Sequence, residues 1–450
     1  MSVAVIGAGW AGLACAIDLA AAGLRPLVLE AARQPGGRAR GVAVDGQRLD
    51  NGQHLLIGAY TDTLALMRQV GADPDALLTR HRLFVASPEL RLALPPLPPP
   101  LDVAAGLLLA RGAGWGEKFR AVRAMKALEA AGWSAPPEQT VADWLAATGL
   151  AGGVLARRLY APLCLAALNT PLEAASMAVF ARVLWDSLGA GARVPGATDY
   201  LVAAADLSAV FPDPAATWIA ARGGAVRTSA RVKSLVPAVA GWSIELDGAA
   251  QETIEARQVV LAVAPQHAAA LLPDIPAAQA TRDLLAGYRY EPIATVYLGL
   301  SPGIGLARPI VQIDGPAPDD SPAWVFDRGA AGNPGVLACV ISARGPWQAL
   351  PEAELARRLL AHVRPYLRAA GQKAPLRDAP PLAWHKRIVE ARATFAASAG
   401  LGRPAAITLA PGLHLAGDWT WAPWPATLEG AVRSGRRAAA AVLGTARENG

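Results

Sequence analysis

Three glycines near the start of the chain have the spacing of a dinucleotide-binding loop. The run 7–12 (GAGWAG) lies between a predicted strand at 3–6 and a predicted helix that begins after Gly9. Gly7 permits a tight turn, Gly9 lets the backbone approach a pyrophosphate, and Gly12 lets the helix pack closely on the strand. The helix N-terminus then faces the anion. The expected contacts with a dinucleotide are Gly7, Gly9, Trp10, Ala11 and Gly12.

A carboxylate and a second glycine-rich loop follow the next predicted strand, at 27–29. Glu30 can accept hydrogen bonds from a ribose diol and would repel a 2′-phosphate, so FAD or NAD is favoured over NADP. The run 35–40 (PGGRAR) adds two glycines for close approach and arginines that can pair with a pyrophosphate; a solvated basic loop is the alternative. The expected contacts here are Glu30, Gly36, Gly37, Arg38 and Arg40.

The far end of the chain has a matching set of residues. Asp418 follows a predicted strand at 413–416 and is placed to bond a hydroxyl of a ribityl chain. A predicted helix at 427–443 would direct its N-terminal amides at the pyrimidine edge of a flavin, which carries negative charge when reduced. The tail contains no cysteine, so the flavin is expected to be non-covalent. The expected contacts at this end are Gly417, Asp418, Ala426, Thr427 and Leu428.

Candidates for the chemical step lie in two short segments. Asp50 and His54 can act as acid–base groups near the flavin, or they can satisfy backbone groups of a hairpin and loop. Trp419, Trp421 and Trp424 can line a cavity and stabilise a cation by cation–π contact, and core packing is the equal alternative. The histidines lack metal-ligand spacing and the three cysteines are widely separated, so no metal site is expected.

The elements that hold these residues indicate an α/β protein with an insertion. A βαβ opening and buried strands at 258–263 and 413–416 predict a Rossmann-like nucleotide-binding domain made of separate segments. Between them, 101–190 is mostly helical, and 294–300 and 336–341 predict a second sheet. The FAD-binding domain is expected to comprise 1–75, 200–268 and 385–450, and a helical plus mixed-sheet substrate domain to comprise 76–199 and 269–384.

Composition limits the function classes. The 450 residues are 53% hydrophobic and 17% charged, which excludes a disordered chain. The net charge of +6 is spread without a long basic run or aromatic–basic interleaving, so no nucleic-acid partner is expected. No apolar stretch reaches the roughly 20 residues of a membrane span, and the start does not read as a signal peptide. A cytoplasmic location is therefore expected.

Together these motifs resemble the flavin amine oxidase and polyprene desaturase superfamily, over nearly the whole chain. The resemblance implies an FAD-binding domain of the amine oxidase type, in which Val232 offers its backbone to the adenine. The narrower string 50–60 (DNGQHLLIGAY) is similar to the bacterial squalene-associated FAD-dependent enzymes, the hydroxysqualene dehydroxylases of hopanoid biosynthesis. The segments 392–395 (RATF) and 417–421 (GDWTW) are compatible with that family.

The narrower resemblance implies that the hydroxyl of hydroxysqualene is removed to give squalene. Reduced FAD would be the hydride donor, and the sequence does not identify the electron donor that reduces it. An allylic hydroxyl leaves poorly unless it is protonated, so an acid is expected within 50–54. Departure of the hydroxyl leaves a carbocation, for which Trp419 and Trp421 are the expected wall.

A long isoprenoid substrate also predicts peripheral contact with the inner face of a membrane. The segment 95–131 combines a Pro-rich break, the apolar run 107–109 and an amphipathic helix. Covering the substrate domain is the alternative role of this helix. The basic residues expected to meet anionic lipid are Lys118, Arg120, Arg123 and Lys126.

Two other function classes stay open. The first is another FAD-dependent polyprene desaturase or an amine oxidase, although Lys386 gives little support for the flavin-facing lysine of amine oxidases. The second is a non-catalytic prenyl-binding module like the Rab GDP-dissociation inhibitors, which share the fold without using flavin. Such a module need not retain Glu30, the loop at 36–40 or Asp418.

Overall fold

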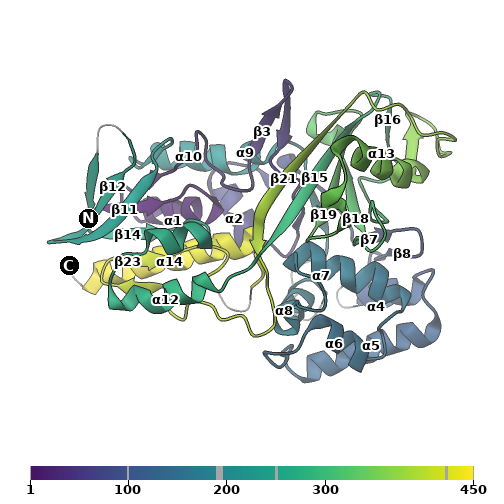
Figure 1. Cartoon of the computed structure of the whole chain (residues 1–450), viewed down its shortest axis with the longest axis horizontal. Helices are drawn as coiled ribbons and strands as arrows, with labels where there is room; N and C mark the ends of the chain where they lie inside the picture. Colours follow the sequence, from purple (N-terminus) through teal and green to yellow (C-terminus); the bar gives the residue numbers. More distant parts are fainter. Residues whose placement is uncertain (1, 99–100, 189–195, 249–251, 421–423, 449–450) are drawn as a thin grey trace.

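The nucleotide-binding half is built on one six-stranded sheet that joins both ends of the chain (Figure 1). The computed structural model describes residues 2–98, 101–188, 196–248, 252–420 and 424–448. The strands are β1 (Val3–Ile6), β2 (Leu27–Leu29), β10 (Ala225–Arg227), β14 (Gln258–Leu261), β22 (Thr408–Ala410) and β23 (Leu413–Leu415). Their order is β10-β2-β1-β14-β23-β22, and only β22 is antiparallel to its neighbour.

Both faces of this sheet are buried, which is why its central strands are near-continuous apolar runs. Val3 and Val5 face helices α1 (Trp10–Ala21), α10 (Pro212–Ala220) and α14 (Leu428–Glu448). Ala4 and Ile6 face the other way, towards the antiparallel sheet β11 (Val232–Ala238), β12 (Gly241–Leu246) and β13 (Thr253–Ala256). Helix α1 lies between α10 and α14 (Figure 1).

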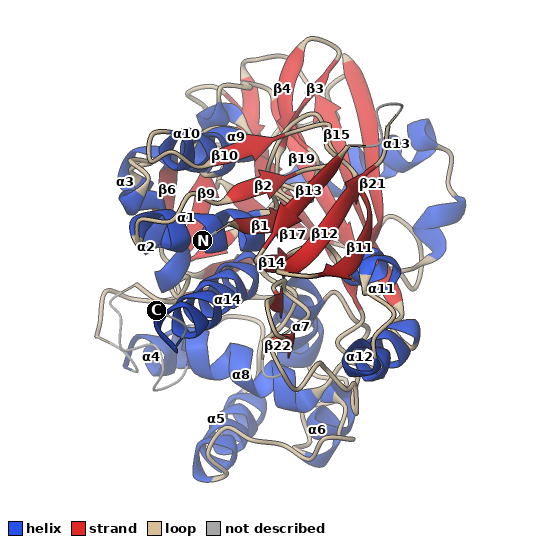
Figure 2. Cartoon of the chain, turned by 90° about the vertical axis from the view of Figure 1, so that its left-hand side faces the viewer, coloured by secondary structure: helices blue, strands red, loops and turns tan. Residues whose placement is uncertain are grey.

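The second half of the molecule contains a five-stranded antiparallel sheet and a helical lobe (Figure 2). The strands are β15 (Tyr290–Gly299), β17 (Ile310–Ile313), β18 (Ala323–Asp327), β19 (Val336–Ser342) and β21 (Trp384–Phe395), in the order β17-β18-β19-β15-β21. Helix α13 (Glu352–Val363) packs on one face of this sheet. The lobe consists of α4 (Leu101–Leu109), α5 (Trp115–Ala130), α6 (Val141–Ala147), a π-helical turn at Ala156–Tyr160, α7 (Ala161–Leu168) and α8 (Met177–Leu188).

Short elements connect the two halves. The hairpin of β3 (Gly41–Val44) and β4 (Gln47–Asp50) turns at Asp45 and Gly46, whose φ angles of 47° and 80° fit a type I′ turn. The smaller sheets are β5 (Leu56–Ile57) with β9 (Tyr200–Ala203) and β6 (Leu78–His81), β7 (Phe84–Ala86) with β8 (Arg91–Ala93), and β16 (Ile304–Leu306) with β20 (Leu367–Ala369). The remaining α-helices are α2 (Thr61–Gln69), α3 (Pro74–Leu77), α9 (Leu207–Val210), α11 (Pro265–Leu271) and α12 (Pro276–Ala286).

One expected domain boundary is wrong. Residues from 385 onward were expected in the FAD-binding domain, but β21 pairs antiparallel with β15 along the second sheet. The strand is only partly buried and has no continuous apolar run, so its sequence does not reveal its partner. Both long strands lead from the second sheet towards the nucleotide-binding half (Figure 1), so Phe395 at the end of β21 lies near that half.

Candidate cofactor and active site

The loop between β1 and α1 has the geometry that its glycines predict. Gly7 has a φ of +105° and donates its amide to the carbonyl of Leu29 at 2.7 Å. A Cβ atom at Gly12 would lie 1.9 Å from the Gly7 carbonyl oxygen, so only glycine fits where the helix crosses the strand. A Cβ atom at Gly9 would meet no atom of the described part of the chain within 4 Å. Gly9 is the N-cap of α1 and has no side-chain cap, so this open space borders helix amides that can receive a pyrophosphate.

The second glycine-rich loop lies directly against the first. The Gly36 amide donates to the Ala8 carbonyl at 2.8 Å, and the indole of Trp10 donates to the Ala39 carbonyl at 3.0 Å. The side chains of Trp10 and Ala11 are therefore buried, and only their backbone is placed to meet a cofactor. Gly36 and Gly37 have φ angles of +110° and +61°, which favour glycine. The guanidinium of Arg40 donates to the Gly37 carbonyl and supports the loop.

Glu30 connects this region to the strand expected to meet the adenine. Its carboxylate accepts hydrogen bonds from the amides of Ala8 at 2.7 Å and Ala32 at 2.8 Å. The Ala230 amide donates to the Glu30 carbonyl at 2.8 Å, which brings Val232 at the start of β11 close to the end of β2. The carboxylate therefore lies at the carboxyl edge of the parallel sheet, where nucleotides bind in this class of fold.

Asp418 brings the far end of the chain to the same site. Its Oδ2 accepts a hydrogen bond from Nη2 of Arg38 at 2.6 Å. Its Oδ1 is buried and has no hydrogen-bond partner among the described residues, so it can accept from a hydroxyl of a bound molecule. Gly417 has a φ of +143° and donates its amide to Ser434 Oγ on α14 at 2.8 Å, which fixes the turn.

The N-terminus of α14 lies next in the chain. Ala426 precedes Thr427, whose Oγ1 accepts from the Gly430 amide at 3.1 Å, and the helix begins at Leu428. Glu429 is fully buried and accepts from the amides of Asp62 at 3.1 Å and Thr63 at 2.9 Å, so it caps α2. The cofactor-binding ends of the chain are thus joined to each other by helix caps as well as by the sheet.

These residues fit a flavin adenine dinucleotide. The open face at Gly9 suits the pyrophosphate, Glu30 suits the adenosine ribose, and the unpartnered Oδ1 of Asp418 suits the ribityl chain. The three cysteines, Cys15, Cys164 and Cys339, are all buried and far in sequence from 417–428. The structure brings these residues together at one edge of the sheet.

The structure separates the two acid–base candidates. Asp50 has no solvent-accessible side-chain surface. Its Oδ1 accepts from the Leu207 amide at 2.7 Å, and its Oδ2 lies 2.9 Å from Nη1 of Arg328. Burial raises the pKa of this carboxyl, and the charge of Arg328 opposes the rise. A carboxylate enclosed in this way cannot reach a substrate, so the expectation that Asp50 is a catalytic acid is corrected: it anchors the end of β4.

His54 is only partly buried and remains a candidate. Its Nδ1 lies 2.7 Å from the Gly52 carbonyl oxygen, which can only accept, so the geometry assigns the proton to Nδ1 and leaves Nε2 as an acceptor. Burial lowers the pKa of His54, the hydrogen bond to the Gly52 carbonyl opposes this in part, and the nearby charge of Arg38 lowers the pKa further. The neutral imidazole is therefore the dominant form at pH 7.

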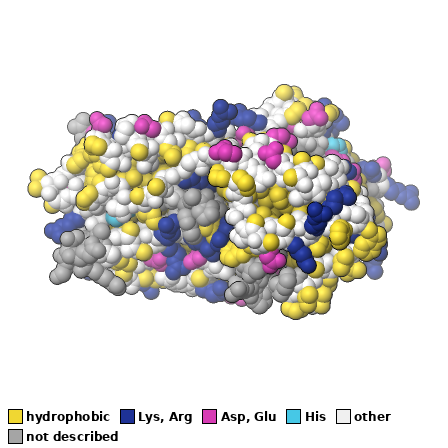
Figure 3. Space-filling view, turned by 90° about the horizontal axis from the view of Figure 1, so that it is seen from below, with side chains coloured by type: hydrophobic (Ala, Val, Ile, Leu, Met, Phe, Trp, Pro, Cys, Tyr) yellow, Lys and Arg dark blue, Asp and Glu magenta, His cyan; other side chains and the backbone are white. Residues whose placement is uncertain are grey.

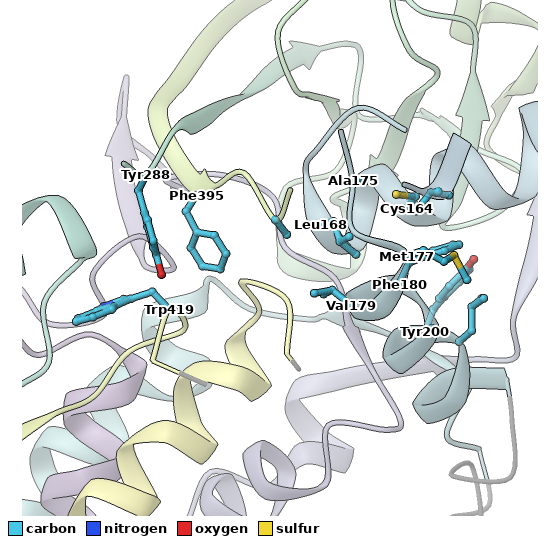
Figure 4. Packing of buried hydrophobic residues seen from close by; sticks show 14 of the residues in the cluster. Cys164, Leu168, Ala175, Met177, Val179, Phe180, Tyr200, Tyr288, Phe395 and Trp419 are labelled. Atoms are coloured by element: carbon cyan, nitrogen blue, oxygen red, sulfur yellow. The ribbon is translucent and has the colours of Figure 1, made fainter. Parts of the chain in front are cut away.

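Trp419 is a packing residue. Its side chain has no solvent-accessible surface, and its indole nitrogen donates to the Val263 carbonyl at 3.0 Å. It lies beside Tyr288 and Phe395 (Figure 4), whose ring centroids are 5.6 Å apart. The expectation that Trp419 forms the open wall of a cavity is therefore corrected. The indole instead fills the space next to Gly417, where a Cβ atom would lie 2.4 Å from it.

Of the other two candidate tryptophans, the structure describes only Trp424. Trp421 lies outside the described residues. Trp424 is buried, and the guanidinium carbons of Arg182 and Arg433 lie 4.8 Å and 4.5 Å from the centroid of its ring. Two cations already occupy positions near this ring, so its role here is to hold the loop before α14 against α8.

Sequence reasoning missed several residues that support the site. Arg328 pairs with Asp50, Tyr297 and Thr295 bond the 50–54 backbone, and Glu429 caps α2. Glu429 comes directly after Leu428, which is one of the expected cofactor contacts. The sequence around a glutamate in a helix does not show whether its carboxylate is buried. Arg328 is an arginine in a loop and carries no signal in the sequence.

Comparison with known proteins identifies the family. Residues 10–443 match the family of flavin containing amine oxidoreductases. The chain is 33% identical to a hydroxysqualene dehydroxylase of Rhodopseudomonas palustris over 99% of each chain, and 30% identical to one of Sinorhizobium fredii over 97% of each. The solved cyclohexylamine oxidase from Brevibacterium oxydans shares the fold, with a TM-score of 0.65 and 19% identity over 99% of each chain. The chain therefore belongs to the flavin containing amine oxidoreductases and is an FAD-dependent oxidoreductase.

Proposed function

We propose that this enzyme reductively removes the hydroxyl group of hydroxysqualene to give squalene. The observation that carries the proposal is the position of the segment 50–60, whose sequence resembles hydroxysqualene dehydroxylases. It borders the cofactor-binding loop, because the Asn51 amide donates to the Arg40 carbonyl at 2.9 Å. The full-length similarity to two proteins that carry this name supports the same substrate.

The proposed reaction breaks one C–O bond and forms one C–H bond. The substrate takes up a hydride equivalent and a proton, and water is released. Bound FAD supplies the hydride chemistry, and an electron donor that is not identified restores its reduced form. Within 50–54, His54 is the acid–base group that is not enclosed, and its free Nε2 can hold the proton or pass it through a water.

Turnover of purified enzyme tests this function. We expect the FAD-loaded enzyme, reduced without oxygen, to convert hydroxysqualene to squalene and to leave putrescine and cyclohexylamine unchanged. An amine oxidase role has little structural support, because Lys386 is exposed on β21. Oxidation of either amine without any squalene formation would favour that alternative. Purification without a yellow colour, even after FAD is added, would favour a prenyl-binding module.

We also propose that the helical lobe contacts a membrane. Most of the exposed large apolar side chains in the described residues lie on or next to α4 and α5. We call this set the α4–α5 patch; it consists of Leu97, Leu101, Leu108, Leu109, Trp115 and Phe119. Hydrophobic side chains gather on the lobe side of the molecule with Lys and Arg among them (Figure 3). Burial of a side chain such as Leu109, which is 70% exposed, contributes about 1.5–3 kcal/mol. A hydrocarbon substrate partitions into bilayers, so a lipid surface is the occupant that fits.

The charges around the α4–α5 patch favour anionic lipid. Arg111, Arg120, Arg123 and Lys126 are exposed, and each contributes about 1 kcal/mol near such a surface. Lys118 does not belong to this set, which corrects the expectation. It is buried and donates to the carbonyls of Leu108 at 2.8 Å and Ala110 at 2.7 Å at the end of α4. Within the described ranges, no helix is long and apolar enough to cross a bilayer.

Sedimentation with liposomes tests the membrane contact. We expect binding to phosphatidylglycerol vesicles at low salt and weaker binding at high salt or to phosphatidylcholine. The double variant Leu109→Ser, Phe119→Ser should lose about tenfold or more of this binding. The matched control Val236→Ser, Val239→Ser removes exposed apolar side chains from β11 and its turn and should bind normally. Absence of sedimentation at low salt, or a dimer that the double variant dissociates, would contradict the proposal.

A further inference from the structure

A fully buried arginine connects the second sheet to the segment 50–54. Arg328 follows β18, and its side chain is 1% exposed. Its Nη1 lies 2.9 Å from Oδ2 of Asp50 and donates to Oε1 of Gln53 at 2.9 Å. Gln53 in turn donates from Nε2 to the His54 carbonyl at 3.0 Å. A continuous set of contacts therefore leads from Arg328 to His54.

The same segment is fixed on two further sides. The Gln53 amide donates to Thr295 Oγ1 at 3.2 Å, and the Tyr297 hydroxyl donates to the Asp50 carbonyl at 3.0 Å; both partners are on β15. On the cofactor side, Asn51 bonds the loop that contains Arg40. The segment 50–54 is thus held between the second sheet and the cofactor-binding loop.

Stability alone does not account for Arg328. Its Nε and Nη2 are buried and have no hydrogen-bond partner among the described residues. Taking a guanidinium out of water costs free energy that one carboxylate and one amide offset only in part, and an apolar side chain of similar volume is often at least as stable. A methionine at this position would fill the same space without that cost. The charge of Arg328 and its several hydrogen-bond donors therefore have a role other than stabilising the fold.

We propose that Arg328 is a positioning residue that acts through Asp50 and Gln53 to hold His54 in one orientation at the cofactor site. Arg328 fixes both ends of the turn: Asp50 at its start and the carbonyl of His54, through Gln53, at its end. With the turn closed, the imidazole meets the Gly52 carbonyl and keeps its Nε2 free. The role in catalysis rests on the proposed function, whereas the orientation of the imidazole does not depend on the substrate.

Histidine NMR of the FAD-loaded protein tests the proposal without any substrate. The chain has six histidines, so 15N-histidine labelling gives few signals, and His54→Gln assigns the one that matters. We expect wild-type His54 to carry its proton on Nδ1 and to titrate below the usual pH of about 6.5. Arg328→Met should give a mixture of tautomers, because the imidazole no longer meets the Gly52 carbonyl in one orientation. Arg328→Lys keeps the charge but not the fork of donors, and it should move the signal in the same direction.

Two further variants separate positioning from stability. Arg357→Met is the matched control, because this exposed guanidinium pairs only with Glu354 on α13 among the ion pairs of the described residues, and it should leave the His54 signal unchanged. Asp50→Asn combined with Arg328→Met removes both buried charges. The melting temperature of this double variant should recover most of what Arg328→Met alone loses. Its His54 signal should stay altered, and its turnover should stay at least tenfold below that of the wild type. A wild-type His54 signal in the Arg328 variants that fold would overturn the proposal, as would full recovery of turnover in the double variant. If hydroxysqualene is not turned over by wild-type enzyme but the His54 signals behave as expected, the substrate assignment fails and the positioning role stands.

Discussion

Arg38 and Asp418 form an ion pair between residues that are 380 positions apart, with 2.6 Å between Nη2 and Oδ2. Arg38 lies in the loop after β2, and Asp418 lies in the loop after β23. The pair therefore joins the two ends of the chain at the carboxyl edge of one parallel sheet. It uses one oxygen of the carboxylate and leaves Oδ1 for a ligand.

Replacement of Asp418 should weaken FAD binding in two steps. Asp418→Asn keeps an acceptor oxygen but loses the charge that Arg38 meets, and we expect about a tenfold rise in Kd. Asp418→Ala also removes the acceptor, and a hydrogen bond to a charged group contributes about 1.5–3 kcal/mol, so the rise should reach roughly a hundredfold. Quenching of FAD fluorescence by the apoprotein measures both. Equal Kd values for wild type and Asp418→Ala would remove Asp418 from the cofactor site.

Glu30→Ala should reduce FAD retention more than Glu30→Gln. The alanine leaves the amides of Ala8 and Ala32 without their acceptor and removes the group that meets the ribose, whereas glutamine keeps one acceptor oxygen. Retention after gel filtration, read from the ratio of absorbance at 450 and 280 nm, compares the variants. Glu252→Ala, which removes an exposed carboxylate paired with Arg227, is the control and should retain FAD fully. The prediction is wrong if glutamine and alanine behave alike.

The rate should depend on pH through His54. Because burial lowers its pKa, the protonated form becomes abundant only below the usual value of about 6.5. If His54 delivers the proton to the leaving oxygen, kcat rises as the pH falls below that value. His54→Gln should retain FAD, lose about 10²–10⁴-fold in rate and show no such rise. A rate within threefold of wild type would transfer the acid role to another group.

His414 should make the fold sensitive to acid. This buried imidazole on β23 meets Gln258 Oε1 at 2.7 Å and Thr408 Oγ1 at 3.0 Å, and burial lowers its pKa from 6.5 to about 4. Between these pH values the unfolded chain binds a proton at His414 that the folded chain does not. The contribution of the neutral imidazole to the free energy of unfolding is therefore fully present above pH 6.5 and is lost as the pH falls towards 4. The difference corresponds to roughly 3 kcal/mol at the acid end.

Melting temperatures between pH 4 and 7 measure this effect. His414→Gln removes the titrating group, and its melting temperature should fall less steeply with acid than that of the wild type. His362→Gln changes a partly exposed histidine on α13 and should follow the wild-type curve. Parallel curves for all three proteins would show that His414 does not control the acid response.

The parts of the site that were predictable are local in sequence. The close contact at Gly12 is predictable from the glycine spacing because the atom that a Cβ would clash with, the Gly7 carbonyl oxygen, belongs to the same loop. The hairpin at 41–50 follows from Asp45-Gly46, and Glu30 follows from its place at the end of a strand. In each case the physical cause lies within about 20 residues of the effect.

The parts that were not predictable depend on distant partners. The sequence predicts that Asp50 is a catalytic acid, whereas in the structure Arg328 encloses its carboxylate. No periodic pattern in the sequence links the two positions. Trp419 reads as a cavity wall, but its accessible surface depends on how Val263, Tyr288 and Phe395 pack around it. Lys118 lies on an amphipathic helix, yet the carbonyls at the end of α4 draw it inward. Tertiary contacts determine whether these three side chains are buried, and local sequence patterns do not show those contacts.

The strand order β10-β2-β1-β14-β23 has a consequence for how the enzyme is made. The first two strands leave the ribosome early; β10 follows its neighbour β2 only about 200 residues later, and β14 follows its neighbour β1 only about 250 residues later. Strand β23, which pairs with β14, and helix α14, which packs against α1, are synthesised last. Contacts between such distant segments form slowly, and unpaired strands are prone to aggregate meanwhile. Because Asp418 comes after almost all the rest, a nascent chain lacks this contact with the flavin, and full affinity for the cofactor requires a nearly complete polypeptide.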